Sequence, residues 1–453
     1  MNLSEIVDRA LSGALSEGAE QAEAFTVRSR TLSLYVEDSK VKNLEEKVDH
    51  GLAVRAVEGS RLGEASSTIG LMNHVDTCVS SAIKVTRASA PDPNFMGFAI
   101  GGASTIPAPG VWDKVVAQLD PETLSSKGME VVEACVADGD MKVPRGLIRT
   151  ANIETEVGNS NGMSAAHRNT MVYLHFTSMT SSGKAGEGEE RFHSTRLDMD
   201  AAGIGKALAR GARNSADAVA YRGRTDVPVF IGPGQLAEMF ASSIGFSVDS
   251  ENVNRMRSAW TAKLGEQVTS PELTIIDDPS DPRGILSATH DDEGVPTRRK
   301  PIIERGTLRS FLYDTYNGSM AGVDTTGNGM RRDPINSQNI YQNQVSVSPM
   351  NMVVSAGSWS TEELLASFDE AVLIERFAWP QVNPITGSIG LEVRCAHILE
   401  GGEVSRTVKH ALLTGNMFES LSRVVGIADD QRVRGSWILP TMGFDGMKLV
   451  GNP

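Results

Sequence analysis

The sequence predicts an α+β fold, with α/β units in the N-terminal half and a mostly β C-terminal domain. Apolar residues recur at helical spacing in several N-terminal segments, and between these segments apolar and polar residues alternate as they do in strands. From Val227 onward the pattern changes to short β-type runs, separated by turn signals such as Glu400-Gly401-Gly402. No repeat of fixed period is present, which argues against a solenoid.

Residues 1–88 are expected to form the first unit, in the order α-β-β-β-α. Its helices are indicated by apolar residues that follow the i, i+3, i+4 rule, and its strands by the alternation of apolar and polar side chains. Ser4 is the expected cap of the first helix. The clearest of these elements lie at 3–18, 32–36, 52–56 and 75–83.

Residues 89–111 are rich in proline, glycine and alanine, a composition typical of a linker or a long surface crossing. A central α/β unit, residues 112–222, is expected to follow. Within it, Asn and Gly at 158–162 supply the positive-φ positions that a hairpin loop needs. Its predicted elements are a helix, two hairpin strands and a closing helix, at 121–137, 147–157, 170–180 and 198–217.

Residues 223–453 are expected to form the mainly β domain. Short apolar runs such as VPVFI, KPIIE and GLEVRCAHIL have the length and composition of strands. We expect helices to interrupt these strands near 235–246, 361–369 and 415–425.

The charge balance bears on the partners that the chain can have. Its 453 residues include 43 Lys and Arg against 57 Asp and Glu, a net charge of −14 at pH 7. Because phosphate binding depends largely on basic surface, this balance argues against binding to nucleic acid or to a membrane surface. No run approaches the ~18 apolar residues of a membrane span, and the N-terminus does not resemble a signal peptide. Three cysteines without a C-x-x-C pattern suit a reducing compartment, so we expect a cytoplasmic protein.

Two stretches of the C-terminal half carry a family resemblance. Residues 231–247 read IGPGQLAEMFASSIGFS, and residues 291–332 read DDEGVPTRRKPIIERGTLRSFLYDTYNGSMAGVDTTGNGMRR. Both resemble the PmbA/TldD family of metallopeptidases. In the zinc-bearing subunits of that family, a GPG-type turn leads into a helix that carries H-E-x-x-x-H. This chain has the turn, at Gly232-Pro233-Gly234, but the motif does not follow.

The resemblance implies that the family's metal site is degenerate here. Aligning the GPG turns places Ala241 and Phe246 at the two histidine positions and Ser242 at the glutamate position. Alanine and phenylalanine have no lone pair for a metal, and serine cannot act as a carboxylate base. The cysteine that completes the family's site is also missing, because the comparable stretch offers Arg434 and Gly435. The chain thus resembles the zinc-free TldE/PmbA-type subunit, with no catalytic residue and no metal of its own.

The resemblance further implies a non-catalytic subunit of a metallopeptidase complex that degrades or processes unfolded peptides. The expected partner is a zinc-bearing TldD-type homologue in a heterodimer, or a second copy of the chain in a homodimer. Zinc is expected in the partner subunit. Two alternatives stay open. One is a peptide-binding homodimer or scaffold without peptidase activity, and the other is an active metallohydrolase with an unrecognised metal site.

Two loops in the resembling region are candidates for binding a peptide or the partner. The first, HDDE at 290–293, is either a solvated acidic turn or part of a cleft wall. The second, TGNG at 326–329 with two arginines after it, lacks the lysine spacing of a P-loop. It is either a solvated surface loop or a loop whose arginines pair with carboxylates of a peptide or a partner chain. Neither has the pattern of a core segment. The candidate residues are His290, Asp291, Asp292, Gly327, Asn328, Gly329, Arg331 and Arg332.

Overall fold

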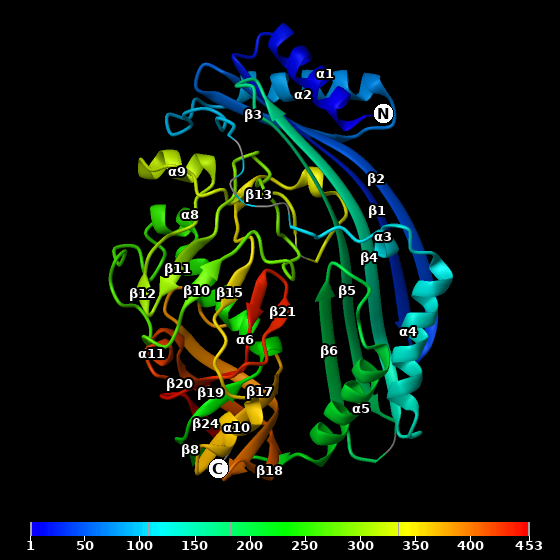
Figure 1. The fold of residues 1–453 in the computed structure, drawn as a ribbon, viewed down its shortest axis with the longest axis vertical. Coiled ribbons are helices and arrows are strands. Elements are labelled where there is room, and N and C mark those ends of the chain that lie inside the picture. Colours follow the sequence, from blue (N-terminus) through cyan, green and yellow to red (C-terminus); the bar gives the residue numbers. More distant parts are fainter. Residues whose placement is uncertain are drawn as a thin grey trace.

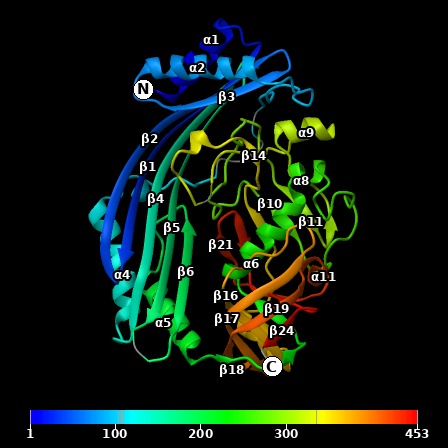
Figure 2. The same cartoon turned by 180° about the vertical axis from the view of Figure 1, so that it is seen from behind.

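A long, curved antiparallel sheet and a β-rich body packed against its concave side make up the structure (Figures 1 and 2). The computed structural model describes residues 2–102, 104, 106, 109–181, 183–333 and 335–451. Helices and strands occur in separate layers rather than in strict alternation, which confirms the predicted α+β class. The positions outside the described residues fall in each of the expected units and in the expected linker, at 1, 103, 105, 107, 108, 182, 334, 452 and 453.

The curved sheet is built from both N-terminal units. Its strands are β1 Gln21–Glu37, β2 Lys40–Glu58, β3 Arg61–Thr68, β4 Met141–Asn159, β5 Ser164–Thr180 and β6 Glu187–Ser194. In the described part of the chain their order is β3-β2-β1-β4-β5-β6. The expected units 1–88 and 112–222 each contribute three of these strands, and β1 joins the two sets because it pairs antiparallel with both β2 and β4.

The central strand β1 is buried on both faces. Leu32 and Leu34 belong to a core that they share with Leu124 on the helical side of the sheet. Phe25 and Val27 instead pack with Tyr341, which belongs to the C-terminal body. Successive side chains of a strand point to opposite faces, so the even-numbered and odd-numbered positions of β1 pack on opposite sides of the sheet.

Helices cover the outer face and the upper end of this sheet (Figure 1). They are α1 Leu3–Ser16, α2 Met72–Ala88, the short α3 Lys114–Ala117, α4 Pro121–Val136 and α5 Ala201–Asp217. The expected cap of α1 at Ser4 is wrong. Asn2 caps the helix, because its side-chain oxygen accepts a hydrogen bond from the backbone nitrogen of Ser4 at 3.3 Å.

The C-terminal body is mainly β, as predicted. Its strands are β7 Val219–Ala220, β8 Arg224–Thr225, β9 Val229–Ile231, β10 Ile275–Asp277, β11 Lys300–Glu304, β12 Thr307–Leu308, β13 Gly329–Met330, β14 Ser346–Val347, β15 Met352–Val354, β16 Glu370–Phe377, β17 Ser388–Glu400, β18 Glu403–Lys409, β19 Ala411–Asn416, β20 Val424–Ile427, β21 Arg432–Arg434, β22 Trp437–Leu439, β23 Met442–Phe444 and β24 Lys448–Gly451. Two larger sheets run in the orders β12-β11-β10-β15-β22-β21 and β20-β23-β9-β16-β17-β19-β24-β8.

One hydrophobic core combines side chains of both larger sheets with those of a helix at 233–240. The helices of this body are α6 Pro233–Phe240, α7 Phe246–Val248, α8 Ser250–Asn254, α9 Thr315–Ala321, α10 Thr361–Ala366 and α11 Met417–Leu421. Gly232 caps α6 and Pro233 occupies its first turn, a position that proline favours. Among the described residues, no helix combines the length and the apolar character that crossing a bilayer requires.

The C-terminal body docks on the curved sheet through a short segment around Tyr341. The Tyr341 ring is buried over Gly51 of β2, and its hydroxyl forms a hydrogen bond with the Thr68 hydroxyl at 2.8 Å. A Cβ atom at Gly51 would lie 1.9 Å from the ring carbon Cδ1. Glycine is therefore required at this position, because any larger residue would displace the docked segment.

We predict that Gly51→Ala lowers the free energy of unfolding by about 1–3 kcal/mol, the usual cost of overpacking a filled core. The matched control is Gly390→Ala in strand β17, because a Cβ atom there meets nothing within 4 Å. Urea denaturation of both variants measures the effect. Equal stability of the two variants would contradict the close docking of Tyr341.

Candidate functional site

The positions that the sequence aligned with a metal site line one cleft. The cleft has a volume of about 680 Å³, and Ala241, Ser242 and Phe246 form part of its wall. Arg434 and Gly435 also line it, although they lie almost 200 residues further along the chain. The structure therefore brings together the two parts of the site that the sequence predicted to be degenerate.

The helix that carries these positions has an unusual turn. After α6 ends at Phe240, residues Ala241–Gly245 form a π-helix, in which the backbone nitrogen of Phe246 donates to the carbonyl of Ala241. In an α-helix, two positions five apart point about 140° away from each other. A π-helix, hydrogen-bonded from i to i+5, brings them to nearly the same face. This backbone thus has the shape that a pair of ligands at 241 and 246 would need.

The side chains in this turn offer no metal ligand. Ala241 exposes only a methyl group. The Ser242 hydroxyl donates to the Glu238 carbonyl at 2.9 Å and accepts from the Val382 backbone nitrogen at 3.2 Å. The Phe246 ring lies under the Arg257 guanidinium, 5.7 Å from its centroid. Backbone groups thus engage the serine hydroxyl, and the alanine and phenylalanine side chains have no atom that could coordinate zinc.

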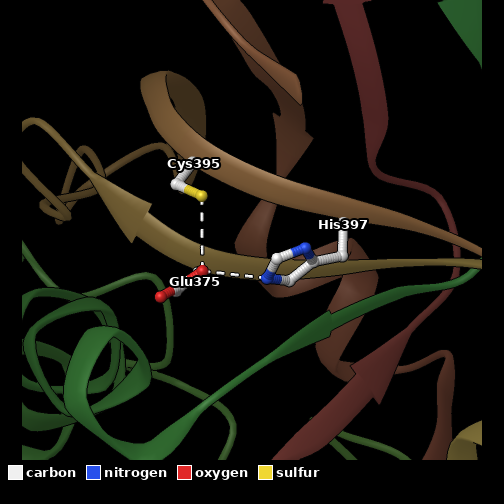
Figure 3. Close-up of side chains that lie close together, drawn as sticks. All are labelled: Glu375, Cys395 and His397. Carbon is white, nitrogen blue, oxygen red and sulfur yellow. Dashed lines mark hydrogen bonds and ion pairs between the residues drawn. The ribbon is translucent and has the colours of Figure 1, made fainter. Parts of the chain in front are cut away.

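A different group of potential ligands lies on the ten-stranded sheet (Figure 3). Within the described residues, the ligand atoms of Glu375, Cys395 and His397 all lie within 4.8 Å of one another. Cys395 and His397 are two apart on β17 and share a face. Glu375 occupies a bulge in β16, where the register of the two strands shifts between Ile374 and Arg376.

Hydrogen bonds within the protein connect the members of this group. Glu375 Oε2 lies 2.8 Å from His397 Nε2, 3.3 Å from the Cys395 thiol and 3.1 Å from Asn214 Nδ2, which donates to it. Burial raises the pKa of the Glu375 carboxyl, but the His397 and Asn214 hydrogen bonds outweigh it and the pKa is lowered. Burial, followed by the Glu375 charge, raises the pKa of Cys395. The sulfur is thus a thiol at neutral pH, whereas zinc binds the thiolate.

Sequence reasoning missed this group. The only local signal was the C-x-H spacing at Cys395 and His397, which places both side chains on one face of a strand. Their partner Glu375 comes from another strand, and it reaches them only through a bulge. A two-residue spacing without the third member is too common in strands to indicate a site.

The two candidate loops contact each other, and they are buried. Asp291 Oδ1 accepts from the backbone nitrogens of Glu293 and Val295, at 3.0 and 2.9 Å, and Oδ2 accepts from that of Gly329 at 2.9 Å. Burial, then the neighbouring Glu293, raise the pKa of Asp291 well above its ordinary range. The expectation of a solvated turn is wrong, because Asp291, Asp292 and Glu293 are at most 3% exposed.

Asp292 holds the second loop. Its Oδ2 accepts from the backbone nitrogens of Arg331 and Arg332, at 2.7 and 2.8 Å, and its Oδ1 accepts from Arg332 Nε at 2.7 Å. Arg331 reaches further, to Glu64 of the curved sheet at 2.7 Å. The arginines that the sequence offered to a peptide or a partner are therefore paired with carboxylates of their own chain.

The remaining candidates also find partners inside the chain. The Asn328 amide donates to Asp277 Oδ2 at 2.9 Å, the same oxygen that accepts from Lys300. Gly327 has a φ of +71°, and a Cβ at Gly329 would lie 2.3 Å from a Glu293 oxygen. Only His290 is partly exposed, with Nε2 3.3 Å from the Gly102 carbonyl. A role in binding a peptide or a partner stays a prediction for these residues.

A buried ionic junction connects these loops to the curved sheet. Arg55 of β2 donates to both oxygens of Glu23 at 2.8 Å and to Glu293 Oε1 at 2.9 Å. The three side chains are at most 8% exposed. Burial raises the pKa of Glu23 to about 7, and the charge of Arg55 opposes this rise. One guanidinium thus forms ion pairs with two buried carboxylates, one from the curved sheet and one from the C-terminal body.

Comparisons with known proteins agree with this architecture. The family model described as PmbA/TldA metallopeptidase C-terminal domain matches residues 224–451, half of the chain. The chain belongs to the PmbA/TldD metallopeptidase family. The model of domain 1 of the same family matches residues 22–86, which span the first three strands of the curved sheet and most of α2.

Relatives over nearly the whole length carry metalloprotease names. The metalloprotease TldD homologue of Haemophilus influenzae is 25% identical over 90% of this chain and 86% of its own length. Metalloprotease PmbA of Escherichia coli O157:H7 is 24% identical over 98% of this chain and 96% of its own length. The crystal structure of TldE from Thermococcus kodakarensis matches with a TM-score of 0.89 at 22% identity, covering 98% of this chain and 100% of that chain. At this identity the structural match shows the shared fold alone.

The names of these PmbA/TldD relatives imply a metal in the family. Ala241, Ser242 and Phe246 do not fit that metal, because they offer no ligand set and the serine oxygen is bonded to backbone groups. Glu375, Cys395 and His397 have suitable ligand atoms, but on this sheet they are bonded to one another. The side chains at 241, 242 and 246 could therefore not hold the family's metal.

We predict that Arg55→Met lowers the free energy of unfolding by about 3–5 kcal/mol at pH 8, because it leaves Glu23 and Glu293 buried without a counter-charge. The folded-state pKa of Glu23, about 7, lies above its ordinary 4.5, so this carboxyl contributes less stability as pH rises from 4.5 to 7. Removing Arg55 raises that pKa further. The loss should therefore shrink at pH 5, where Glu23 takes up a proton.

Denaturant titrations at the two pH values measure this difference. Arg9→Met is the matched control, because Arg9 forms an exposed ion pair with Asp76 and exposed pairs contribute little. The ionic junction would be contradicted if Arg55→Met lowered the free energy of unfolding as little as the control does, or if its effect grew toward acid pH.

Proposed function

We propose that this chain is the non-catalytic subunit of a TldD/TldE-type metallopeptidase complex that degrades or processes unfolded peptides. The observation that carries the proposal is the cleft at the π-helix. It keeps the turn geometry that two ligands five residues apart would need, while Ala241, Ser242 and Phe246 supply none of the chemistry. Loss of ligands with retention of the cleft is expected of a subunit that still binds a chain but no longer cuts it.

In this proposal the zinc of the partner supplies the hydrolytic chemistry, and this chain binds and orients the peptide. Its cleft presents apolar surface at Ala241 and Phe246 and charged groups at Arg434 and Glu238. Mixed lining of this kind suits an extended peptide, whose backbone needs hydrogen-bond partners and whose side chains need apolar contact. Two related subunits can close a cavity that excludes folded proteins, through an interface of roughly 2,000 Å² or more.

The alternative of an active metallohydrolase has one specific observation in its favour, the group Glu375, Cys395 and His397. Against it stand the protonated state of the buried thiol and the three hydrogen bonds that already occupy the Glu375 oxygen. A zinc ion would have to displace the thiol proton and break these bonds. We therefore favour a structural role for this group, bracing the bulge between β16 and β17.

We predict that the purified chain, equilibrated with zinc and then dialysed, retains far less than one zinc per chain. The physical reason is that Ala241, Ser242 and Phe246 offer no ligand set and that, among the described residues, only Glu375, Cys395 and His397 form a group of three potential ligands, which is closed by its own hydrogen bonds. Elemental analysis measures the content, in parallel with Cys395→Ser and with Cys78→Ser as the matched buried-cysteine control. Stoichiometric zinc that Cys395→Ser loses and Cys78→Ser keeps would support the metallohydrolase instead.

We predict that the chain assembles with a zinc-bearing homologue from the same genome, and that the mixture cleaves an unfolded peptide faster than either protein alone. Light scattering at micromolar concentration measures the mass, and a quenched fluorescent peptide measures cleavage. A 48.5 kDa particle for the chain, both alone and in the mixture, would refute the complex. Assembly into a homodimer without any gain in cleavage would favour the peptide-binding scaffold.

A further inference from the structure

A second cavity, of about 570 Å³, lies between the edge strand β6 of the curved sheet and strand β21 of the C-terminal body. Five arginines line it, against two acidic side chains, Glu190 and Asp198. The chain as a whole carries a net charge of −14. Arg191 already pairs with Glu189 and Glu238, and Arg283 pairs with Asp281. The other three arginines still outnumber the two acidic side chains of the lining, and an excess of positive charge in such an acidic protein indicates a site for an anion. The arginines are Arg191, Arg196, Arg283, Arg432 and Arg434.

Arg434 is the member of this set that most needs an anion. It is partly buried, and its hydrogen bond goes to a backbone carbonyl, that of Val433, at 2.9 Å. In the described residues no carboxylate forms an ion pair with it, whereas the more deeply buried Arg55 and Arg332 both have carboxylate partners. Burial, together with the nearby Arg432 and Arg191, lowers the pKa of Arg434 to about 10, although Glu190 opposes this. The charge of Glu190 thus compensates Arg434 only in part, without an ion pair, and a buried cation without a paired anion is costly.

His193 gives an independent indication. Its side chain lines the same cavity, the residue is 7% exposed, and neither ring nitrogen has a hydrogen-bond partner among the described residues. Buried polar atoms are nearly always paired, so two orphaned nitrogens on one ring call for a missing ligand. Burial, then Arg434 and Arg191, lower the pKa of His193 to about 3. An anion beside the ring would offset the repulsion between a protonated His193 and the two arginines.

The cavity is continuous in its lining with the cleft at the π-helix. Arg191, His193 and Arg434 line both. Apolar groups of Phe192, Ile204 and Val433 complete the second cavity. A peptide lying in the cleft would therefore reach a pocket that combines a guanidinium, an imidazole and an apolar wall.

We propose that the cavity between β6 and β21 binds the C-terminal carboxylate of the peptide, with Arg434 as the bidentate donor, His193 as a second donor and the apolar wall for the terminal side chain. Planar guanidinium and carboxylate groups match each other through two parallel hydrogen bonds. The proposal rests on the proposed function for the ligand being a peptide, and it adds that the peptide enters with a defined end. Carboxylate recognition itself is a property of this chain.

Binding of a fluorescently labelled unstructured peptide tests the proposal, with the chain alone and with its complex. Three versions of the peptide are compared: one with a free C-terminal carboxylate, one with a C-terminal amide, and an amide version with an internal glutamate. We expect the free acid to bind about tenfold more tightly than the amide, as a charge-assisted hydrogen bond allows. Arg434→Gln should abolish that preference, whereas Arg309→Gln, the loss of an exposed arginine paired with Glu304, should leave it intact.

A second readout follows the His193 ring by NMR during a pH titration. The free acid should raise the pKa of His193 and the amide should not. Because Arg434 forms no ion pair and Glu190 already has a raised pKa, so that it can take up a proton, Arg434→Gln should keep the thermal stability of the parent chain close to its original value, which separates loss of binding from loss of fold.

Equal binding of acid and amide, a preference that survives Arg434→Gln, or an equal loss in Arg309→Gln would overturn the proposal. Tight binding of the internal-glutamate amide would overturn the assignment to the terminus and show that the site recognises acidic side chains. If the acid preference is found but no zinc-bearing partner assembles, the proposed complex fails and the carboxylate site stands. If the complex cleaves peptides with no acid preference, the site fails and the complex stands.

Discussion

The ionic junction at Arg55 is the constraint on which the arrangement of the molecule depends. One guanidinium holds Glu23 in the curved sheet and Glu293 in the C-terminal body, and all three side chains are nearly inaccessible to water. A buried ion pair contributes little net stability relative to apolar residues, but it tolerates no change in geometry, because a displaced partner leaves an uncompensated charge. The junction therefore orients the two layers more than it binds them together, and the packing of Tyr341 on Gly51 adds the apolar contact.

The loops that meet at this junction explain why charged residues fill the interior here. Asp291 and Asp292 satisfy backbone nitrogens that no strand partner reaches, and Arg332 balances Asp292. Irregular backbone can be buried only if its polar groups find partners. The acidic run thus supplies hydrogen-bond partners in a region where the chain forms few strands. The orientation of the curved sheet relative to the C-terminal body also sets the distance between β6 and β21, which line the cavity described above.

The shape of the cleft depends on packing and on backbone hydrogen bonds. Packing of Leu236, Met239 and Phe240 holds α6 in the main core, with each side chain fully buried. The π-turn that follows is held by backbone hydrogen bonds and by the Ser243 hydroxyl, which donates to the Met239 carbonyl at 2.6 Å. None of these contacts involves a metal ligand. The cleft therefore keeps its shape with Ala241 and Phe246 in its wall, as the proposed non-catalytic role requires.

The sequence by itself determined the family, the fold class and many of the longer helices and strands, since turns and apolar periodicity are local properties of the chain. Strand β6 was not predicted, because its sequence EGEERFHS has no clear alternation and forms a strand only by pairing with β5. Only the tertiary structure decided that Asp292 is buried against Arg332, 40 residues away, and that Glu375 meets Cys395 and His397. An acidic side chain has the same local pattern whether it faces water or a buried cation, and the difference lies in contacts between segments that are distant in the chain.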